Sequence, residues 1–231
     1  MKMKFLLFFA AAGLMTVGAS AQSARLQAGL NLANVSVTDN GRVDDANMLT
    51  SFQVGIIGDL PFAGILSFQP GLVFTGKGTK SQSGDPSSAT YYKSTSNPYY
   101  IEVPMNVVFR TPATSKNSSR FFAGAGPYIA VGVAGKNKVE GKYLGVGFSS
   151  DEDIKFSNDD PTTLDYEEGA GFGILKRFDY GLNGTAGIEG KSMTLAVNYG
   201  LGLAKLQSGG NSSQDNNNKH RVLSFTLGFK F

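Results

Sequence analysis

The chain has 231 residues, a formal net charge of +3, 30 glycines and no cysteine. Without cysteine it has no disulfide framework and no thiolate metal site, so its stability comes from packing or from closing a sheet. The small net charge gives no electrostatic footprint for nucleic acid. Abundant glycine and few strong helix formers predict one domain that is nearly all β.

The first 21 residues have the three parts of a secretory signal peptide. A positive start at 2–4 precedes an apolar run at 5–17, and small residues surround the expected cleavage site at 19–21. The apolar run is shorter than the roughly 20 residues of a membrane-spanning helix. Cleavage would remove two of the 21 Lys and Arg and none of the 18 Asp and Glu, which leaves a net charge of +1. We therefore expect a signal peptide at 1–21 and an exported domain at 22–231.

Eight stretches of the exported domain alternate apolar residues with small or polar ones. A period of two is typical of a strand, because successive side chains point to opposite faces. Each stretch has about ten residues, the length that a tilted strand needs to cross a bilayer, whereas strands of soluble proteins are shorter. In chain order, the stretches are 26–33, 52–60, 66–74, 99–110, 121–133, 178–189, 193–203 and 223–231.

Long and short connections alternate between these predicted strands. Outer-membrane barrels have long extracellular loops and short periplasmic turns. An even number of strands that starts with a long loop places both termini in the periplasm. We therefore predict an all-β fold, an eight-stranded antiparallel up-and-down transmembrane β-barrel. The long connections are 38–49, 76–98, 135–176 and 208–219, and the short ones are 61–64, 111–119 and 190–191.

Aromatic residues fall at both ends of the predicted strands. Two aromatic bands that flank an apolar belt are typical of membrane interfaces. The last strand, LSFTLGFKF, is expected to face lipid with its odd positions and to pair with the first strand, because hydrocarbon tolerates no open sheet edge. The short-turn band comprises Phe62, Phe109, Phe121, Phe229 and Phe231, and the long-loop band comprises Phe52, Tyr99, Tyr100, Phe178 and Tyr180.

The other face of the strands is polar and is predicted to line the lumen. The interior of an eight-stranded barrel is just wide enough for side chains to fill. We expect a packed polar network in which Arg110 and Lys230 pair with Glu102, Asp59 or Glu189. A narrow conducting pathway is the alternative. The remaining predicted lumen residues are Gln27, Asn31, Gln53, Ser67, Gln69, Asn106, Asp179, Asn183, Thr185 and Asn198.

The single histidine, His220, lies at the loop end of the last strand. Acyl-transfer chemistry would need a nearby nucleophile such as Ser208, Ser212 or Ser213, but no spacing marks a triad. We interpret His220 as a solvated side chain. The sequence therefore predicts no enzyme activity and no catalytic residue, cofactor or metal site.

Several segments resemble the small outer-membrane β-barrel family common in the Bacteroidetes, which includes the PorT-like proteins. The resemblance implies an outer-membrane location among lipid and lipopolysaccharide, and insertion by the barrel-assembly machinery. It also implies a possible partner in an envelope or secretion assembly. Phe225, Leu227, Phe229 and Phe231 resemble the C-terminal signal that the assembly machinery reads. The segments are AGLNLANV, FQPGLVFTGKG, YYIEVPMNVVF, FFAGAGPYIAVG and RFDYGLNGTAGIE.

The expected function is a structural or interaction role through the long extracellular loops. A narrow channel or conduit for small solutes or lipids is one alternative. A secreted soluble barrel that binds an apolar ligand, as lipocalins do, is another. That alternative would invert every strand face, so alternation does not exclude it; the aromatic bands, the strand length and the terminal Phe231 favour lipid outside.

Overall fold

The computed structural model describes residues 23–36, 48–112, 118–157, 174–206 and 219–231. The predicted signal peptide lies outside these residues. No helix among them is long and apolar enough to cross a membrane. Their strands are β1 (Ser23–Ser36), β2 (Leu49–Ala63), β3 (Leu66–Gly76), β4 (Thr79–Ser83), β5 (Tyr91–Arg110), β6 (Arg120–Tyr143), β7 (Val146–Asp153), β8 (Lys155–Phe156), β9 (Ile174–Leu175), β10 (Phe178–Glu189), β11 (Met193–Gly202) and β12 (Lys219–Lys230).

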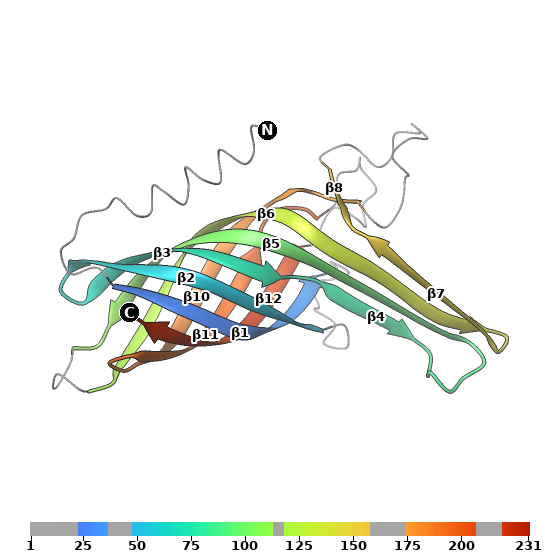
Figure 1. Ribbon diagram of the computed structural model, residues 1–231, viewed down its shortest axis with the longest axis horizontal. Helices are drawn as coiled ribbons and strands as arrows, with labels where there is room; N and C mark the ends of the chain where they lie inside the picture. Colours follow the sequence, from blue (N-terminus) through green and yellow to red (C-terminus); the bar gives the residue numbers. More distant parts are fainter. Residues whose placement is uncertain (1–22, 37–47, 113–117, 158–173, 207–218) are drawn as a thin grey trace.

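Eight of these strands form a closed antiparallel ring (Figure 1). The order around the ring is β1, β2, β3, β5, β6, β10, β11 and β12, and β12 pairs again with β1. The closing register runs from Arg25 opposite Lys230 to Ser36 opposite Lys219. The predicted eight-stranded up-and-down barrel is confirmed, and the C-terminal strand pairs with the first strand as expected.

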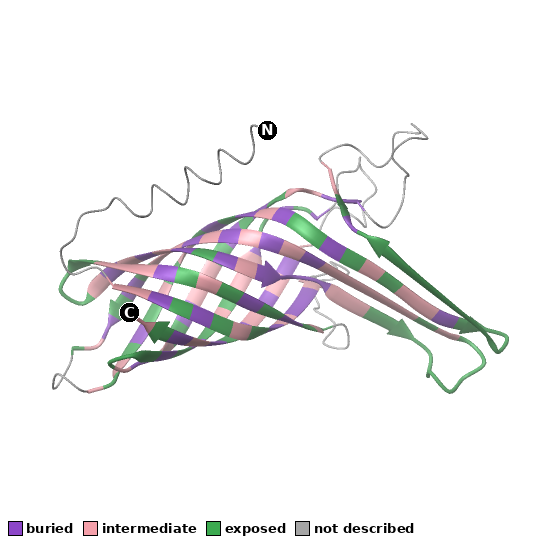
Figure 2. Cartoon of the chain, in the orientation of Figure 1, coloured by how far each residue is buried: buried purple, intermediate pink, exposed green. Residues whose placement is uncertain are grey.

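Exposed and buried residues alternate along the ring strands (Figure 2). On β1, Leu30 is 61% exposed whereas the next residue, Asn31, is fully buried inside the ring. The partner strand repeats this pattern, since Phe225 lies opposite Leu30 and the buried Ser224 lies opposite Asn31. A one-residue register slip would reverse both faces, so the pattern defines the register. Because the apolar face points outward, the soluble barrel with an apolar interior is wrong.

Both aromatic bands lie on the outer face, with one exception. The end of the ring that lies away from the C-terminus is here called the hairpin end. There, Tyr99 stacks on Phe74 with ring centroids 5.3 Å apart and contacts Phe52 at 5.8 Å. The exception is Tyr100, which is 1% exposed and points into the barrel. Its assignment to the outer band was wrong, because Tyr100 follows the outward Tyr99 and so takes the inward parity of β5.

Two predicted loops contain strands. β4 pairs with the first part of β5, β7 pairs with the end of β6, and the β5–β6 ladder continues as far as Tyr91 opposite Lys142. β4, residues 91–98, residues 135–143 and β7 together form a four-stranded sheet, here called the fin, that extends past the ring on the side away from the C-terminus (Figure 1). The prediction of a loop at 76–98 was wrong. The segment is polar and lacks the apolar alternation that predicts a strand, but it forms strands because it pairs with its neighbours in the sheet.

The segment after the fin returns over the hairpin end of the ring. β8 and β9 pair in parallel, and the amide of Lys176 donates to the carbonyl of Leu206. Ile154, Leu175 and Leu206 form a buried apolar cluster with Val35 and Phe156. This cluster, here called the mouth cap, covers the barrel interior at the end opposite the chain termini.

Candidate functional site

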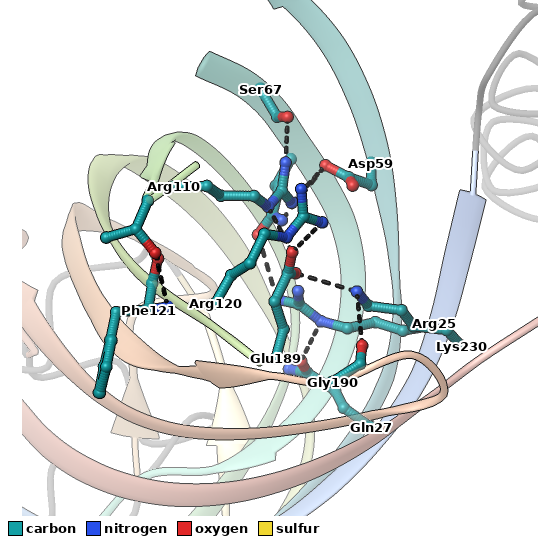
Figure 3. Close-up of polar contacts among 12 residues, drawn as sticks. Arg25, Gln27, Asp59, Ser67, Arg110, Arg120, Phe121, Glu189, Gly190 and Lys230 are labelled. Atoms are coloured by element: carbon teal, nitrogen blue, oxygen red, sulfur yellow. Dashed lines mark hydrogen bonds and ion pairs between the residues drawn. The ribbon is translucent and has the colours of Figure 1, made fainter. Parts of the chain in front are cut away.

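The end of the ring where β1 begins and β12 ends is here called the termini end. Its polar interior is organised around one carboxylate, Glu189 (Figure 3). Glu189 lies near the end of β10, is 1% exposed, and forms ion pairs with Arg110 Nε at 3.0 Å and Lys230 Nζ at 3.0 Å. Arg120 contacts the same carboxylate from the adjacent strand. A buried carboxylate is stable only when cations and donors compensate its lost hydration, and here three cations surround it.

Four further residues, Asp59, Ser67, Arg25 and Gln69, extend this termini-end cluster across the ring. Arg110 Nη2 pairs with Asp59 Oδ1 at 2.8 Å and also donates through Nη1 to Ser67. Arg25 donates to Gln69 Oε1 at 3.1 Å, and Gln69 donates to Asp59 Oδ1 at 3.3 Å. The cluster therefore connects β1, β2, β3, β5, β6, β10 and β12 across the lumen and closes this end of it.

A second cluster lies at the hairpin end and has Lys77 at its centre. Lys77 Nζ forms ion pairs with Glu102 Oε2 at 2.7 Å and Asp179 Oδ2 at 2.9 Å. Tyr128 donates to Asp179 at 3.1 Å, and its ring lies 4.1 Å from the Lys77 ammonium. Asn183 donates to Glu102 Oε1 at 2.9 Å. All of these groups point inward, so this hairpin-end cluster fills the lumen beneath the mouth cap.

A small polar cavity separates the two clusters. It has a volume of about 50 Å³ and extends from Arg25 to Lys77. Such a volume has room for a few water molecules, and its polar lining offers them hydrogen bonds. The cavity is far smaller than the roughly 300–1,000 Å³ of ordinary ligand pockets. Its lining includes Gln53, Asn106, Thr185, Asn198 and Ser224.

The mouth cap closes the lumen above the hairpin-end cluster. The Phe156 ring meets Tyr100 edge-on with centroids 5.6 Å apart. It also lies against Gly132, where a β-carbon would approach the ring to 2.2 Å. Glycine at this position therefore allows the ring to reach the barrel wall. The cap thus lies at one end of the lumen and the termini-end cluster crosses the other end.

The structure places every predicted lumen residue on the inward face. One predicted ion pair differs, because Glu102 does not pair with Arg110 or Lys230. Arg110 contacts Asp59 and Glu189, and Lys230 contacts Glu189. Glu102, in contrast, pairs with Lys77, a residue that the sequence analysis placed in a loop. Arg25 was also missed, although its odd position before Gln27 on β1 shares the inward parity.

His220 is not solvated. It is 1% exposed, and its Nε2 lies 3.3 Å from Tyr100 Oη inside the barrel. The solvated interpretation was wrong because β12 begins at Lys219, four residues earlier than predicted, and even positions of β12 point inward. Ser208, Ser212 and Ser213 lie outside the described residues. Within the described ranges, no group of three His, Asp or Glu side chains is placed to hold a metal ion.

A closed ring of tilted strands with an apolar outer belt and a packed polar lumen defines an integral outer-membrane β-barrel. The family described as "Outer membrane protein beta-barrel domain" matches residues 20–208. The chain belongs to this family, and its location is the bacterial outer membrane.

Solved structures of surface proteins also match the chain. The attachment invasion locus protein Ail of Yersinia pestis is 14% identical, with a TM-score of 0.40, and the match covers 92% of this chain and 100% of Ail. Neisserial surface protein A is 15% identical, with a TM-score of 0.42 and the same coverage of 92% and 100%. Ail has also been solved with the heparin analogue sucrose octasulfate, a match at 12% identity and a TM-score of 0.39 that covers 92% of this chain and 100% of that one. No curated protein matches the chain.

Proposed function

We propose that this protein is a non-enzymatic surface protein of the outer membrane, with both termini in the periplasm and the fin outside the cell as its interaction surface. The observation that carries the proposal is the fin itself, a four-stranded sheet that continues past the membrane-spanning ring. The two side-chain clusters in the lumen and the small cavity between them support an interaction role over the conduit alternative. Lipid and lipopolysaccharide surround the barrel in this arrangement.

The outer strands of the fin support contact with a partner. β4 and β7 are the two ends of the strand order, so each has one backbone edge without a strand partner among the described residues. All eight residues of β7 are exposed. An unpaired strand edge is a template for an extended segment of another chain, which adds to the sheet through backbone hydrogen bonds.

The tip of the β6–β7 hairpin is apolar and strained. Leu144 is 77% exposed and has a φ of 50°, and Gly145 follows with a φ of 84°. Two-residue turns with positive φ at both positions favour Asn-Gly, because a leucine there costs about 1–2 kcal/mol. Tyr143 and Val146 beside it are also exposed. Strain and apolar exposure at one point support a contact role for the tip.

Cysteine labelling tests the orientation, because the chain has no cysteine of its own. Leu144→Cys at the fin tip and Lys191→Cys at the termini-end turn would be exposed to a membrane-impermeant maleimide on intact cells. We expect labelling at 144 at once and at 191 only after the outer membrane is permeabilised. The reverse pattern would overturn the proposed orientation.

Site-specific photo-cross-linking tests the interaction. A photoreactive residue at position 144, compared with one at 191, should give partner adducts on intact cells at the fin only. Leu144→Asn should remove binding to that partner while hydrogen exchange shows the hairpin intact or more protected. Equal binding by Leu144→Asn and the native protein would show that the apolar tip has no contact role.

A narrower proposal concerns an envelope or secretion assembly, as the PorT-like resemblance implies. It is supported by the sequence segments alone and places the partner at the termini end. A cross-linker at Thr111, beside the 111–119 turn, should then capture a periplasmic or membrane protein partner. Adducts at this position with lipid alone would remove the assembly role and leave the fin as the interaction surface.

A further inference from the structure

The two faces of the fin differ in charge. The β5–β6 and β6–β7 registers place Lys93, Lys136, Lys138, Glu140 and Asp151 on the face that continues the outer surface of the barrel, where they form ion pairs with one another. The face that continues the inward positions has a single charged residue among the described ones, Glu152. The second face, here called the inner face, therefore has one carboxylate and otherwise neutral residues, whereas the other face of the sheet is charged.

Hydroxyl groups and aromatic rings make up much of this inner face. One row across the four strands is Ser83, Tyr92, Gly141 and Phe148, as the three strand registers show. The next row toward the barrel begins with Ser81 opposite Ser94. Tyr92 and Phe148 are 44% and 49% exposed. Side-chain hydroxyls both donate and accept hydrogen bonds, and the exposed rings offer apolar faces beside them.

Gly141 determines how the Phe148 ring lies. A β-carbon at position 141 would approach Phe148 Cζ to 2.4 Å, so the ring leans over the glycine and against the backbone of β6. Tyr92 lies on the other side of the same glycine, and strands two places apart in a sheet are about 9.6 Å apart. Two rings thus flank one bare backbone position on an open sheet.

We infer that the inner face of the fin binds a neutral glycan from outside the cell. Sugars present alternating C–H faces and hydroxyl edges, so an aromatic ring contacts the former while serine hydroxyls bond the latter. The missing charge matches an uncharged occupant, whereas a polyanion would meet its complement on the lysine-bearing outer face. The charged outer face continues the lipid-facing surface of the barrel, whereas the inner face continues the lumen-facing positions and points away from it. The inference rests on the proposed function, since it adds a ligand for the inner face of a fin that lies outside the cell.

The test uses the full-length protein in lipid nanodiscs and a panel of neutral hexasaccharides, with cello- and chito-oligosaccharides as the probes. Saturation-transfer NMR would identify the sugar protons in contact, and titration would measure affinity. We expect Tyr92→Ser and Phe148→Ser each to weaken binding about fivefold to tenfold. Tyr91→Ser is the matched control, because Tyr91 is the adjacent residue on the outer face and its loss should leave affinity unchanged.

Folding and alternative ligands are controlled within the same experiment. Phe148→Tyr should retain binding, which separates loss of the ring from loss of the fin, and Gly141→Ala should weaken binding by displacing the ring. If no neutral glycan in the panel binds, the inference is wrong. Binding of heparin or of the cell's own polysaccharide alone, with loss in Lys138→Gln, would also overturn it. Because nanodisc binding does not depend on orientation in the cell, the result stands apart from the cysteine-labelling test.

Discussion

Glu189 shows how one buried side chain on β10 connects its own strand with three others, β5, β6 and β12. Its carboxylate is the shared partner of Arg110, Arg120 and Lys230. Glu189→Gln keeps the shape but removes the negative charge that the three cations share, although Arg110 keeps its ion pair with Asp59. We expect a loss of about 3 kcal/mol in the free energy of unfolding. Urea titration of the barrel in lipid vesicles measures this loss.

The matched control for this change is Glu140→Gln, which removes a carboxylate from the exposed fin. Exposed ion pairs contribute little, so its free energy of unfolding should stay close to that of the native protein. If Glu189→Gln were as mild as the control, the termini-end cluster would not stabilise the barrel.

We expect the mouth cap, an apolar cluster over one end of the barrel, to exclude solvent from the lumen. Phe156→Ala removes the ring that lies over Gly132 and Tyr100. A cysteine at Asn183, which lines the cavity, should then react with a small water-soluble thiol reagent at least about tenfold faster than beneath the intact cap. Leu182→Cys, one residue away on the outer face, is the control and should react at an unchanged rate. Equal rates at 183 with and without Phe156 would mean that the cap does not seal the lumen.

Glu140 gives the fin a small, local dependence on pH, because its ion pairs with Lys93 and Lys138 are exposed. The hydrogen bond from Lys138, followed by that from Lys93, holds the pKa of the Glu140 carboxyl below its usual value. A carboxyl whose pKa is lower in the folded state stabilises that state above its unfolded pKa, about 4.3, and this contribution is lost as the pH falls through the lower folded value. Amide exchange in β5 and β6 of the fin, corrected for intrinsic rates, should be steady from pH 7 to 5 and should lose protection below about pH 4.

Glu140→Gln removes this titration while leaving the hairpin sequence otherwise intact. In this variant, amide protection in the fin, corrected for intrinsic exchange rates, should be the same at pH 7 as below about pH 4. A native fin that keeps full protection in acid would contradict the assigned role of the Lys93–Glu140–Lys138 group.

The whole molecule depends on the last strand in two ways that an experiment can separate. β12 closes the ring against β1, and we propose that Phe225, Leu227, Phe229 and Phe231 also act as the signal for the barrel-assembly machinery. Phe231 itself is 77% exposed at the end of the chain. Phe231→Asn should therefore reduce the folded fraction in cells, seen as less of the heat-modifiable form on SDS gels. The same purified variant should refold into vesicles as well as the native protein.

Two other results would count against the assembly-signal proposal. If Phe231→Asn assembled normally in cells, recognition would not depend on the terminal ring. If it also failed to refold in vesicles, the residue would contribute stability rather than a signal. Leu223→Asn, at the other end of the same face, is the control for a general loss of apolar surface.

The barrel was predictable because a membrane strand leaves a strong local pattern. The alternation in residues 223–231, or in 66–74, states which side chains face lipid, and eight such stretches with alternating connection lengths define the ring. The termini-end pairs among Asp59, Arg110, Glu189 and Lys230 followed from parity and depth alone. Strand ends were less certain, since β12 starts before its apolar run and thereby buries His220.

The fin, the mouth cap and the Lys77 cluster could not be predicted from the sequence, because they form through contacts between segments that no local sequence pattern indicates. The strands of the fin have polar residues on both faces, so only their pairing in the sheet orders them. Lys77 finds Asp179, 102 residues away, because ring closure brings β3 and β10 to the same lumen. Periodicity records which face of a strand meets lipid, whereas partners across the barrel are decided by closure, which brings together residues that are distant in the chain.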